Sequence, residues 1–459
     1  MDAQPTKDFF VSMLVRDVDL LDAVIDLLDN SVDGARRRRP DGDYSGLAVK
    51  LSFSEEHFRI EDNCGGIPLE TARRYAFRFG RDTSNPADPR SIGQFGVGMK
   101  RTLFKLGRSF RVVSRTAEDS FVLEVVVPAW LREERWDFEL VTPAENSGGE
   151  ASIGTVIEAS DLTQSTQADL ADPAWEKRLA EGARLKHRRA LDRGLDITVK
   201  GRRLEPMPLD LSQGKGIEPA VERLVLEGGG VTVLLLAGVS EPDASDAGWY
   251  IFCNDRLVLG PDKSRVTVWR GAGRQARGGV PNYHDQYSRF RGYALFEAVD
   301  PALLPWTTTK TGIDADSPVW RATRPHMERI TRPVIDFLNL LDKERTAVEG
   351  DARRGQPGLL DEDEELQAEL VSAAVEQAPR VGIDDVIADA GDWHEAREFR
   401  APRVDFANLP VPRAWIRYAA EANEVRTARR LMGGGTERDL PNGEVGRRAF
   451  EYYLTSEGE

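Results

Sequence analysis

The chain has 459 residues, of which 77 are acidic and 62 are basic, so its formal net charge is −15 at pH 7. Hydrophobic residues make up 40 % and charged residues 30 %, a balance typical of globular proteins that excludes wholesale disorder. The acidic surplus excludes broad, sequence-independent adhesion to nucleic acid, because phosphates would be repelled over most of the surface.

The sequence carries no sign of a membrane, a secretory signal or a disulfide framework. The longest apolar runs, such as the one around 233–238, have the length of a strand and not of a bilayer span. The first ten residues lack the apolar core of a secretory signal. The two cysteines, Cys64 and Cys253, match no metal or redox spacing. We therefore expect a cytoplasmic protein without membrane attachment.

The first half of the chain predicts one unit over 1–205. Its expected helices cover 18–35, 99–106 (ending at Gly107 as a C-terminal cap) and a basic segment near 175–193. Its expected strands cover 47–53, 57–61, 110–114, 121–127, 138–141, 155–159 and 195–200, and a glycine-rich segment fills 79–98. This order predicts an α+β fold with helices on one face of a mixed sheet.

The second half predicts three further segments. Residues 206–345 are expected to form a β-α-β domain with strands at 231–236, 250–259 and 292–298 and a closing helix over 321–342. Residues 346–375, rich in Gly, Pro and acids, are expected to be an acidic linker. Residues 376–459 are expected to form a small, mainly helical C-terminal region.

The first candidate motif is the helix over 18–35. Asp22, Asp26, Asn30 and Asp33 recur at spacings of four, four and three, which places them on one stripe of a helix. An acidic face that is simply solvated would explain this stripe. However, Asn30, Asp33 and the adjacent Ser and Gly are poor residues for a helix interior. A magnesium site would explain them, because Mg²⁺ takes one or two protein oxygens together with waters and substrate phosphates.

The second candidate motif lies at the end of the strand over 57–61. Asp62 follows the strand, and Gly65 and Gly66 come shortly after it. A hairpin turn could contain such residues. The functional interpretation is that the carboxylate accepts a hydrogen bond from the amino group of a base, while the glycines let the base approach the backbone.

The third candidate motif is the glycine-rich segment over 91–98 that leads into the helix over 99–106. Free N–H groups at the start of a helix form an anion site, and Lys100 in the first turn adds a positive charge that an anion would explain. The segment is not a P-loop, because Arg101 stands where Ser or Thr would coordinate Mg²⁺.

The three motifs follow one another within about 80 residues, and this order resembles the gyrase, heat-shock chaperone, histidine kinase and MutL (GHKL) superfamily of ATPases. Gly154 and Thr155 at the start of a strand add a fourth matching element. The resemblance covers residues 9–205. It implies a Bergerat-type ATP-binding sandwich, a mixed sheet with helices on one face, with ATP and Mg²⁺ as cofactors.

The resemblance implies a role for each matching residue. Asn30 would bind Mg²⁺, and Asp62 would accept from the adenine amino group with Thr155 beside it. Asp26 would be the general base at a position where most hydrolysing members carry glutamate, with Asp22 and Asp29 as rival bases. Cys64 stands where the family has its first glycine. The remaining nucleotide contacts would be Asp33, Gly65, Gly66, Ile67, Gly93, Gln94, Phe95, Gly96, Val97, Gly98 and Lys100.

The second unit resembles the transducer domain of the same superfamily. The resemblance rests on residues 249–259 and on the threonine-rich segment over 304–312. It implies that Lys310 reaches the γ-phosphate of ATP. An ordinary exposed loop lysine is the alternative that the residue alone would favour.

The resemblance implies an ATP-gated homodimeric clamp that hydrolyses ATP slowly and acts on a protein or DNA client, although the net charge does not indicate DNA. The nearest resemblance is to MORC-like and heat-shock-chaperone-like stand-alone prokaryotic members, which suggests antiviral defence or DNA handling. A histidine kinase is not expected, since no phosphoacceptor histidine precedes the first helix. The alternative is a non-hydrolysing, nucleotide-dependent scaffold that recruits a partner through its C-terminal region. The shorter side chain of Asp26 favours that alternative.

Overall fold

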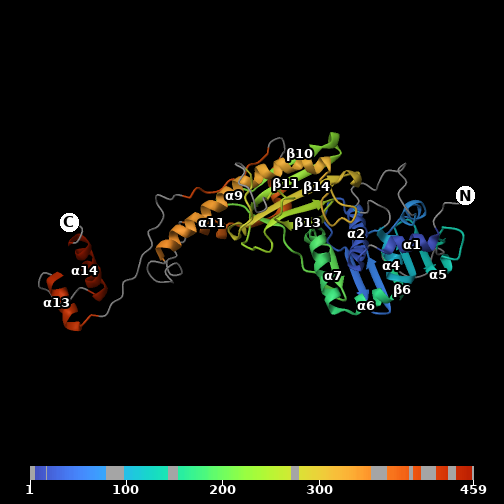
Figure 1. Cartoon of the computed structure of the whole chain (residues 1–459), viewed down its shortest axis with the longest axis horizontal. Helices are drawn as coiled ribbons and strands as arrows, with labels where there is room; N and C mark the ends of the chain where they lie inside the picture. Colours follow the sequence, from blue (N-terminus) through green and yellow to red (C-terminus); the bar gives the residue numbers. More distant parts are fainter. Residues whose placement is uncertain are drawn as a thin grey trace. The chain divides into compact units, whose positions relative to one another are not determined.

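The computed structural model (Figure 1) describes residues 6–16, 18–78, 92, 98–142, 153–269, 279–352, 370–391, 396–404, 420–432 and 441–456. These residues belong to two compact units. One unit comprises Met1–Glu344 and Leu370–Asp405, and the other comprises Arg345–Glu369 and Phe406–Glu459. Within the described ranges, none of the helices combines the length and the apolar character that crossing a membrane requires.

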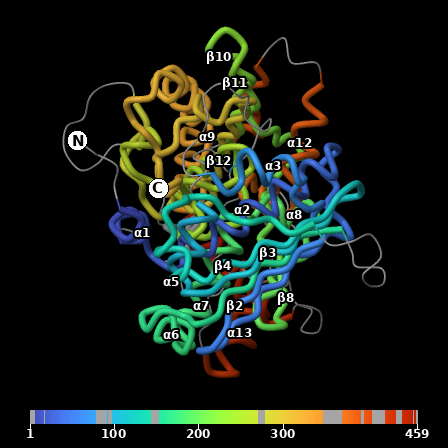
Figure 2. Tube along the Cα trace, turned by 90° about the vertical axis from the view of Figure 1, so that its right-hand side faces the viewer, coloured from blue at the N-terminus to red at the C-terminus, as the bar shows by residue number. Residues whose placement is uncertain are grey.

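The first unit begins with an eight-stranded mixed sheet of order β5-β4-β3-β6-β2-β1-β7-β8, in which only β1 and β7 are parallel. Figure 2 labels β4, β3 and β2 among the strands of this sheet. The strands alternate buried and exposed residues, as expected when one face is covered. Their bounds are β1 (Ala48–Phe53), β2 (His57–Asp62), β3 (Gly107–Arg115), β4 (Ser120–Val126), β5 (Leu140–Val141), β6 (Gly154–Leu162), β7 (Asp196–Val199) and β8 (Arg202–Arg203).

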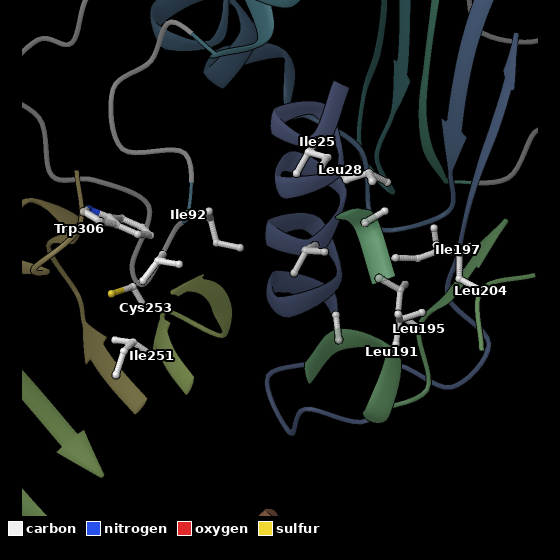
Figure 3. Packing of buried hydrophobic residues seen from close by; sticks show 14 of the residues in the cluster. Ile25, Leu28, Ile92, Leu191, Leu195, Ile197, Leu204, Ile251, Cys253 and Trp306 are labelled. Atoms are coloured by element: carbon white, nitrogen blue, oxygen red, sulfur yellow. The ribbon is translucent and has the colours of Figure 1, made fainter. Parts of the chain in front are cut away.

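Helices cover the buried face of this sheet. The central one is α2 (Leu20–Arg38), which is capped by the Asp19 carboxylate accepting from Leu21 N at 2.8 Å. Figure 3 shows α2 between two groups of buried side chains, with Leu191 and Ile197 on one side and Ile92 and Trp306 on the other. The other helices are α1 (Lys7–Arg16), α3 (Leu69–Thr71), the π-helix η1 (Ala72–Ala76), α4 (Gly98–Leu106), α5 (Val127–Trp130), α6 (Gln164–Ala171), α7 (Pro173–Lys186) and α8 (Arg188–Asp192).

The expected α+β architecture with a mixed sheet is confirmed, but one local prediction was wrong. Gly107 is not a helix cap with positive φ, because it is the first residue of β3. A Cβ atom at Gly107 would lie 2.6 Å from the carbonyl oxygen of Ser160 on β6. The glycine is therefore required by the close approach of two strands and not by the end of α4.

A second sheet follows within the same unit, with the order β10-β11-β14-β12-β13. The strand expected over 250–259 is a hairpin, because Asn254 and Asp255 both adopt positive φ (47° and 66°) and turn the chain between β12 and β13. Helix α9 (Pro318–Ala352) runs along this sheet (Figure 1) and buries Met327 and Val334. The strands of this sheet are β10 (Ala220–Leu226), β11 (Val231–Val239), β12 (Gly248–Cys253), β13 (Arg256–Asp262) and β14 (Phe290–Ala298), and β9 (Asp210–Ser212) precedes them outside the sheet. The 3₁₀ turns are η2 (Glu227–Gly229), η3 (Asp285–Tyr287) and η4 (Pro301–Leu303).

The segment that follows α9 completes a separate two-stranded sheet. Strand β15 (Arg380–Gly382) pairs with β9, and it is flanked by α11 (Val371–Gln377) and α12 (Ile383–Asp389). Residues 370–405 thus group with the first unit, and α9 continues past residue 345. The domain boundaries expected after residues 205, 345 and 375 stay predictions. In the second unit, α13 (Ala422–Met432) packs against α14 (Asn442–Ser456).

Candidate functional site

A pocket that is partly open to solvent lies between α2, the end of β2 and the start of β6. Its apolar walls come from α2, the two strands and α4, whereas its polar groups come mainly from α2 and the strand ends. The lining residues are Leu27, Asn30, Ser31, Gly34, Arg37, Ile60, Asp62, Cys64, Gly66, Ile67, Met99, Thr155 and Ile157. Three separate sequence motifs therefore meet at one cavity.

Asp62 is the acidic group of this pocket. Its Oδ1 accepts from the backbone N–H of Cys64 at 2.8 Å and of Thr155 at 3.3 Å, and its Oδ2 accepts from Ser31 Oγ at 2.9 Å. Burial raises the pKa of Asp62, while these donors oppose that rise. Both oxygens are thus held in place by the fold, and the carboxylate presents acceptor atoms toward the cavity.

Two glycines make the pocket possible. Gly66 has a φ of +74°, and a Cβ atom there would lie 2.2 Å from the carbonyl oxygen of Arg115. Gly34, inside α2, lets the helix pack on the turn after β2, because a Cβ atom would lie 2.8 Å from the carbonyl oxygen of Cys64. This close packing accounts for a glycine in the middle of a helix without any metal ion.

Asn30 lines the pocket from α2 and is partly exposed. Its Nδ2 atom is buried and has no hydrogen-bond partner among the residues that the structure describes. Among the described residues, no group of three or more His, Cys, Asp or Glu side chains could hold a metal ion. The residue that would hold a Mg²⁺ ion here is Asn30, through its amide oxygen, with phosphates and water as the other ligands.

Asp26 lies one turn before Asn30 and is surrounded by cations. Its Oδ2 accepts from Arg101 Nη2 at 2.8 Å, and its Oδ1 lies 3.3 Å from Arg256 Nη1 and 3.6 Å from Lys310 Nζ. A Cβ atom on Gly98, the first residue of α4, would lie 3.4 Å from Asp26 Oδ2. Residues of the second sheet and its loops thus reach the same part of α2 as Gly98.

Asp29 is the most deeply buried acid of α2, with 1 % of its surface exposed. Its Oδ2 accepts from Lys310 Nζ at 2.8 Å and from Arg256 Nη1, and His187 Nε2 lies 3.6 Å from its Oδ1. Burial alone would raise the pKa of Asp29, but the charges of Arg256 and Lys310 outweigh it and lower the pKa to about 2. Asp29 is therefore an anion with fixed cationic partners.

Two further residues of the expected site serve other contacts in this structure. The carboxylate of Asp33 accepts from the backbone N–H of Ile92 at 2.8 and 2.9 Å, so it holds a residue of the glycine-rich segment. Lys100 is 2 % exposed and donates from Nζ to the carbonyl oxygen of Ala76 at 2.8 Å. Burial lowers the pKa of Lys100 to about 7.

The structure thus gathers some of the expected residues in the pocket and separates others from it. The lining includes Asn30, Asp62, Gly66, Ile67 and Thr155, whereas Asp26, Asp33, Gly65, Gly98, Lys100 and Lys310 lie outside the lining. Gly93, Gln94, Phe95, Gly96 and Val97 lie outside the described residues. Of the rival bases, Asp29 is buried, and Asp22 pairs with Lys186 Nζ at 2.6 Å.

Sequence reasoning missed two residues that act in the pocket region. Ser31 received no role in the expected site, although it donates to Asp62. Arg256 lies in the transducer-like segment over 249–259 without an expected role of its own, although its guanidinium reaches Asp26 and Asp29. A polar residue directly after Asn30 was the available signal for Ser31, whereas no local pattern indicated the position of Arg256.

Residues 18–155 match the family model described as "Histidine kinase-, DNA gyrase B-, and HSP90-like ATPase". The matched segment begins just before α2 and ends at Thr155, so it contains every lining residue of the pocket except Ile157. No curated protein matches the chain.

Proposed function

Because residues 18–155 belong to the GHKL superfamily of ATPases, whose domain binds ATP, we propose that the protein is a slow, Mg²⁺-dependent ATP hydrolase that acts as a conformational switch. The observation that carries the proposal is the single pocket in which Asn30, Asp62 and Thr155 meet. The assignment to MORC-like or chaperone-like prokaryotic members, and a role in defence or DNA handling, stay predictions.

In this proposal, adenine binds where Asp62 presents its acceptor oxygens and where Ile60, Ile67 and Ile157 form apolar walls. The triphosphate extends along α2 toward Asn30 and Asp26. A Mg²⁺ ion held by Asn30 would neutralise phosphate charge.

Hydrolysis requires a base near the γ-phosphate. Asp26 would take a proton from the attacking water as the water oxygen bonds to phosphorus and the bond to the ADP oxygen breaks. Lys310, 3.6 Å from Asp26, would contact the γ-phosphate, a contact that ADP cannot offer. A group that binds ATP and not ADP is what a switch needs, because only differential contacts shift a conformational equilibrium.

Calorimetry of Mg·ATP binding and steady-state phosphate release test this proposal. We expect Asn30→Ala to weaken binding and Asp26→Asn to abolish turnover while binding persists. Asp22→Asn is the matched control one turn earlier on α2, where the carboxylate pairs with Lys186. Wild-type protein that takes up no Mg·ATP would refute the proposal, and turnover lost only in Asp22→Asn would move the base to that residue.

A second candidate function is a scaffold that binds ATP without hydrolysing it and recruits a partner through its C-terminal region. One observation favours it, which is that Asp26 is already engaged by the guanidinium groups of Arg101 and Arg256. An enzyme loses phosphate release in Asp26→Asn, whereas a scaffold shows no release in the wild type. Cross-linking with a non-hydrolysable ATP analogue tests the homodimeric clamp, and we expect Lys310→Ala to abolish the ATP-induced dimer.

A further inference from the structure

A buried group of charges joins α2 to the second sheet. Asp29, on α2, holds Lys310 from the threonine-rich loop and Arg256 from the β12–β13 hairpin. The two cations lie 227 and 281 residues away in sequence. All three side chains are less than a tenth exposed, so the contacts are made away from bulk solvent.

Lys310 depends on this contact for its position. Its residue has a φ of +54° in a turn closed by its own N–H donating to the Thr307 carbonyl at 2.8 Å. The turn positions the backbone, but a lysine side chain has four further rotatable bonds and three donors that can point in many directions. The described structure gives its ammonium one hydrogen bond, to Asp29 at 2.8 Å.

The groups around this contact explain why Asp29 is suited to hold the ammonium. Asp26, Arg256 and His187 face the same spot from α2, β13 and the α7–α8 junction, and Asp26 is further bound by Arg101. Burial lowers the pKa of His187 to about 4, so at neutral pH it adds no charge. Asp29 therefore anchors Lys310 by charge, while the nearby Asp26 is shared among three cations.

We propose that Asp29 is the positioning residue for Lys310, and that it holds the ammonium beside Asp26 so that it can recognise the terminal phosphate of ATP. The inference rests on the proposed ATP function and deepens it. It assigns the preference for a triphosphate over a diphosphate to a carboxylate that does not itself touch the nucleotide.

The test compares the affinities of Mg²⁺ with a non-hydrolysable ATP analogue and of Mg·ADP in the full chain. We expect Asp29→Asn and Lys310→Ala each to lower the preference for the triphosphate on the order of tenfold, which is the usual effect of losing one charged hydrogen bond. The double variant should lose no more than either single variant, because both remove the same interaction. Asp384→Asn is the control, since it removes ion pairs between α12 and α8 without touching Lys310.

The outcomes separate the alternatives. If Asp29→Asn lowers the affinity for both nucleotides equally, Asp29 has only a structural role, and the proposal is overturned. A stronger preference for the triphosphate would also overturn it, because Asp29 would then compete with the phosphate for Lys310. If the wild type binds neither nucleotide, the ATP function itself is refuted. If the wild type binds both nucleotides and Asp29→Asn keeps the same preference between them, only the positioning role is refuted.

A second pair of variants covers the case in which Asp29→Asn does not fold because Arg256 is left buried beside a neutral group. Asp29→Asn with Arg256→Gln removes both charges of that pair, and Arg256→Gln alone keeps the contact between Asp29 and Lys310. The variant that combines Asp29→Asn with Arg256→Gln should lose the preference for the triphosphate, and Arg256→Gln alone should keep it. Equal loss in both would overturn the proposal.

Discussion

Asp62→Asn gives the sharpest test of how the pocket recognises a base. In the wild type, Oδ1 accepts from two backbone N–H groups and Oδ2 accepts from Ser31 Oγ. Asparagine can keep the first two bonds through its oxygen, and its Nδ2 can donate to the Ser31 hydroxyl, which rotates to accept. The fold should therefore survive the exchange, and a thermal unfolding curve checks that it does.

The change instead reverses the polarity of the atom that meets the base. An adenine amino group would meet the donor Nδ2 in place of an acceptor oxygen. A lost hydrogen bond to a charged group costs about 1.5–3 kcal/mol, and the donors left facing each other bring the total to about 3 kcal/mol. The affinity for Mg·ATP should fall roughly 150-fold, since about 1.4 kcal/mol corresponds to a factor of ten.

The assay is calorimetry with ATP and with inosine triphosphate, which carries a carbonyl acceptor where adenine has its amino group. Asp62→Asn should lose affinity for ATP and gain relative affinity for inosine triphosphate, so the ratio of the two affinities should move toward inosine. A ratio that stays at the wild-type value, in a variant that is folded, would refute the assignment of Asp62 to the base.

Two further predictions concern stability. Gly66→Ala should destabilise the protein by more than Gly46→Ala. Both glycines have positive φ, which costs alanine about 1–3 kcal/mol, but only at Gly66 would the added Cβ lie 2.2 Å from a carbonyl oxygen, so this cost is a lower limit for Gly66→Ala. Equal unfolding midpoints of the two variants would contradict the close approach. The pKa of Lys100 is about 7 in the folded state against 10.5 for the free side chain. The buried charge therefore lowers the stability of the fold by its full amount below pH 7, and this loss of stability shrinks as the pH rises toward 10.5. Lys100→Met should therefore be stabilised most, relative to the wild type, near pH 6–7, and this difference in the free energy of unfolding, measured in urea, should shrink by about 2 kcal/mol between pH 7 and 9. Lys177→Met on the exposed face of α7 is the control. A difference that stays constant with pH would contradict the burial of a charged Lys100.

The local sequence determined most of the secondary structure of the eight-stranded sheet and of the helices that cover it. Alternation and helical spacing are short-range patterns, so the strand ending at Asp62 and the helix carrying Asn30 could be predicted within a few residues. Asp62 was identified because it ends a strand, is followed by glycines and stands between the other two motifs in the order that the GHKL superfamily shows. The same reasoning was wrong at Gly107, since a strand partner more than fifty residues later decides why glycine is needed there.

Only the tertiary structure decided which charges meet around the middle of α2. Nothing near Arg256 or Lys310 in sequence indicates that both would reach Asp29, because burial and pairing are set by how two sheets pack together. Likewise, β15 pairs with β9 across about 170 residues, which no local pattern encodes. The residues that we propose to contact the base were thus accessible from local motifs, whereas the residues that connect the pocket to the rest of the molecule depend on long-range packing.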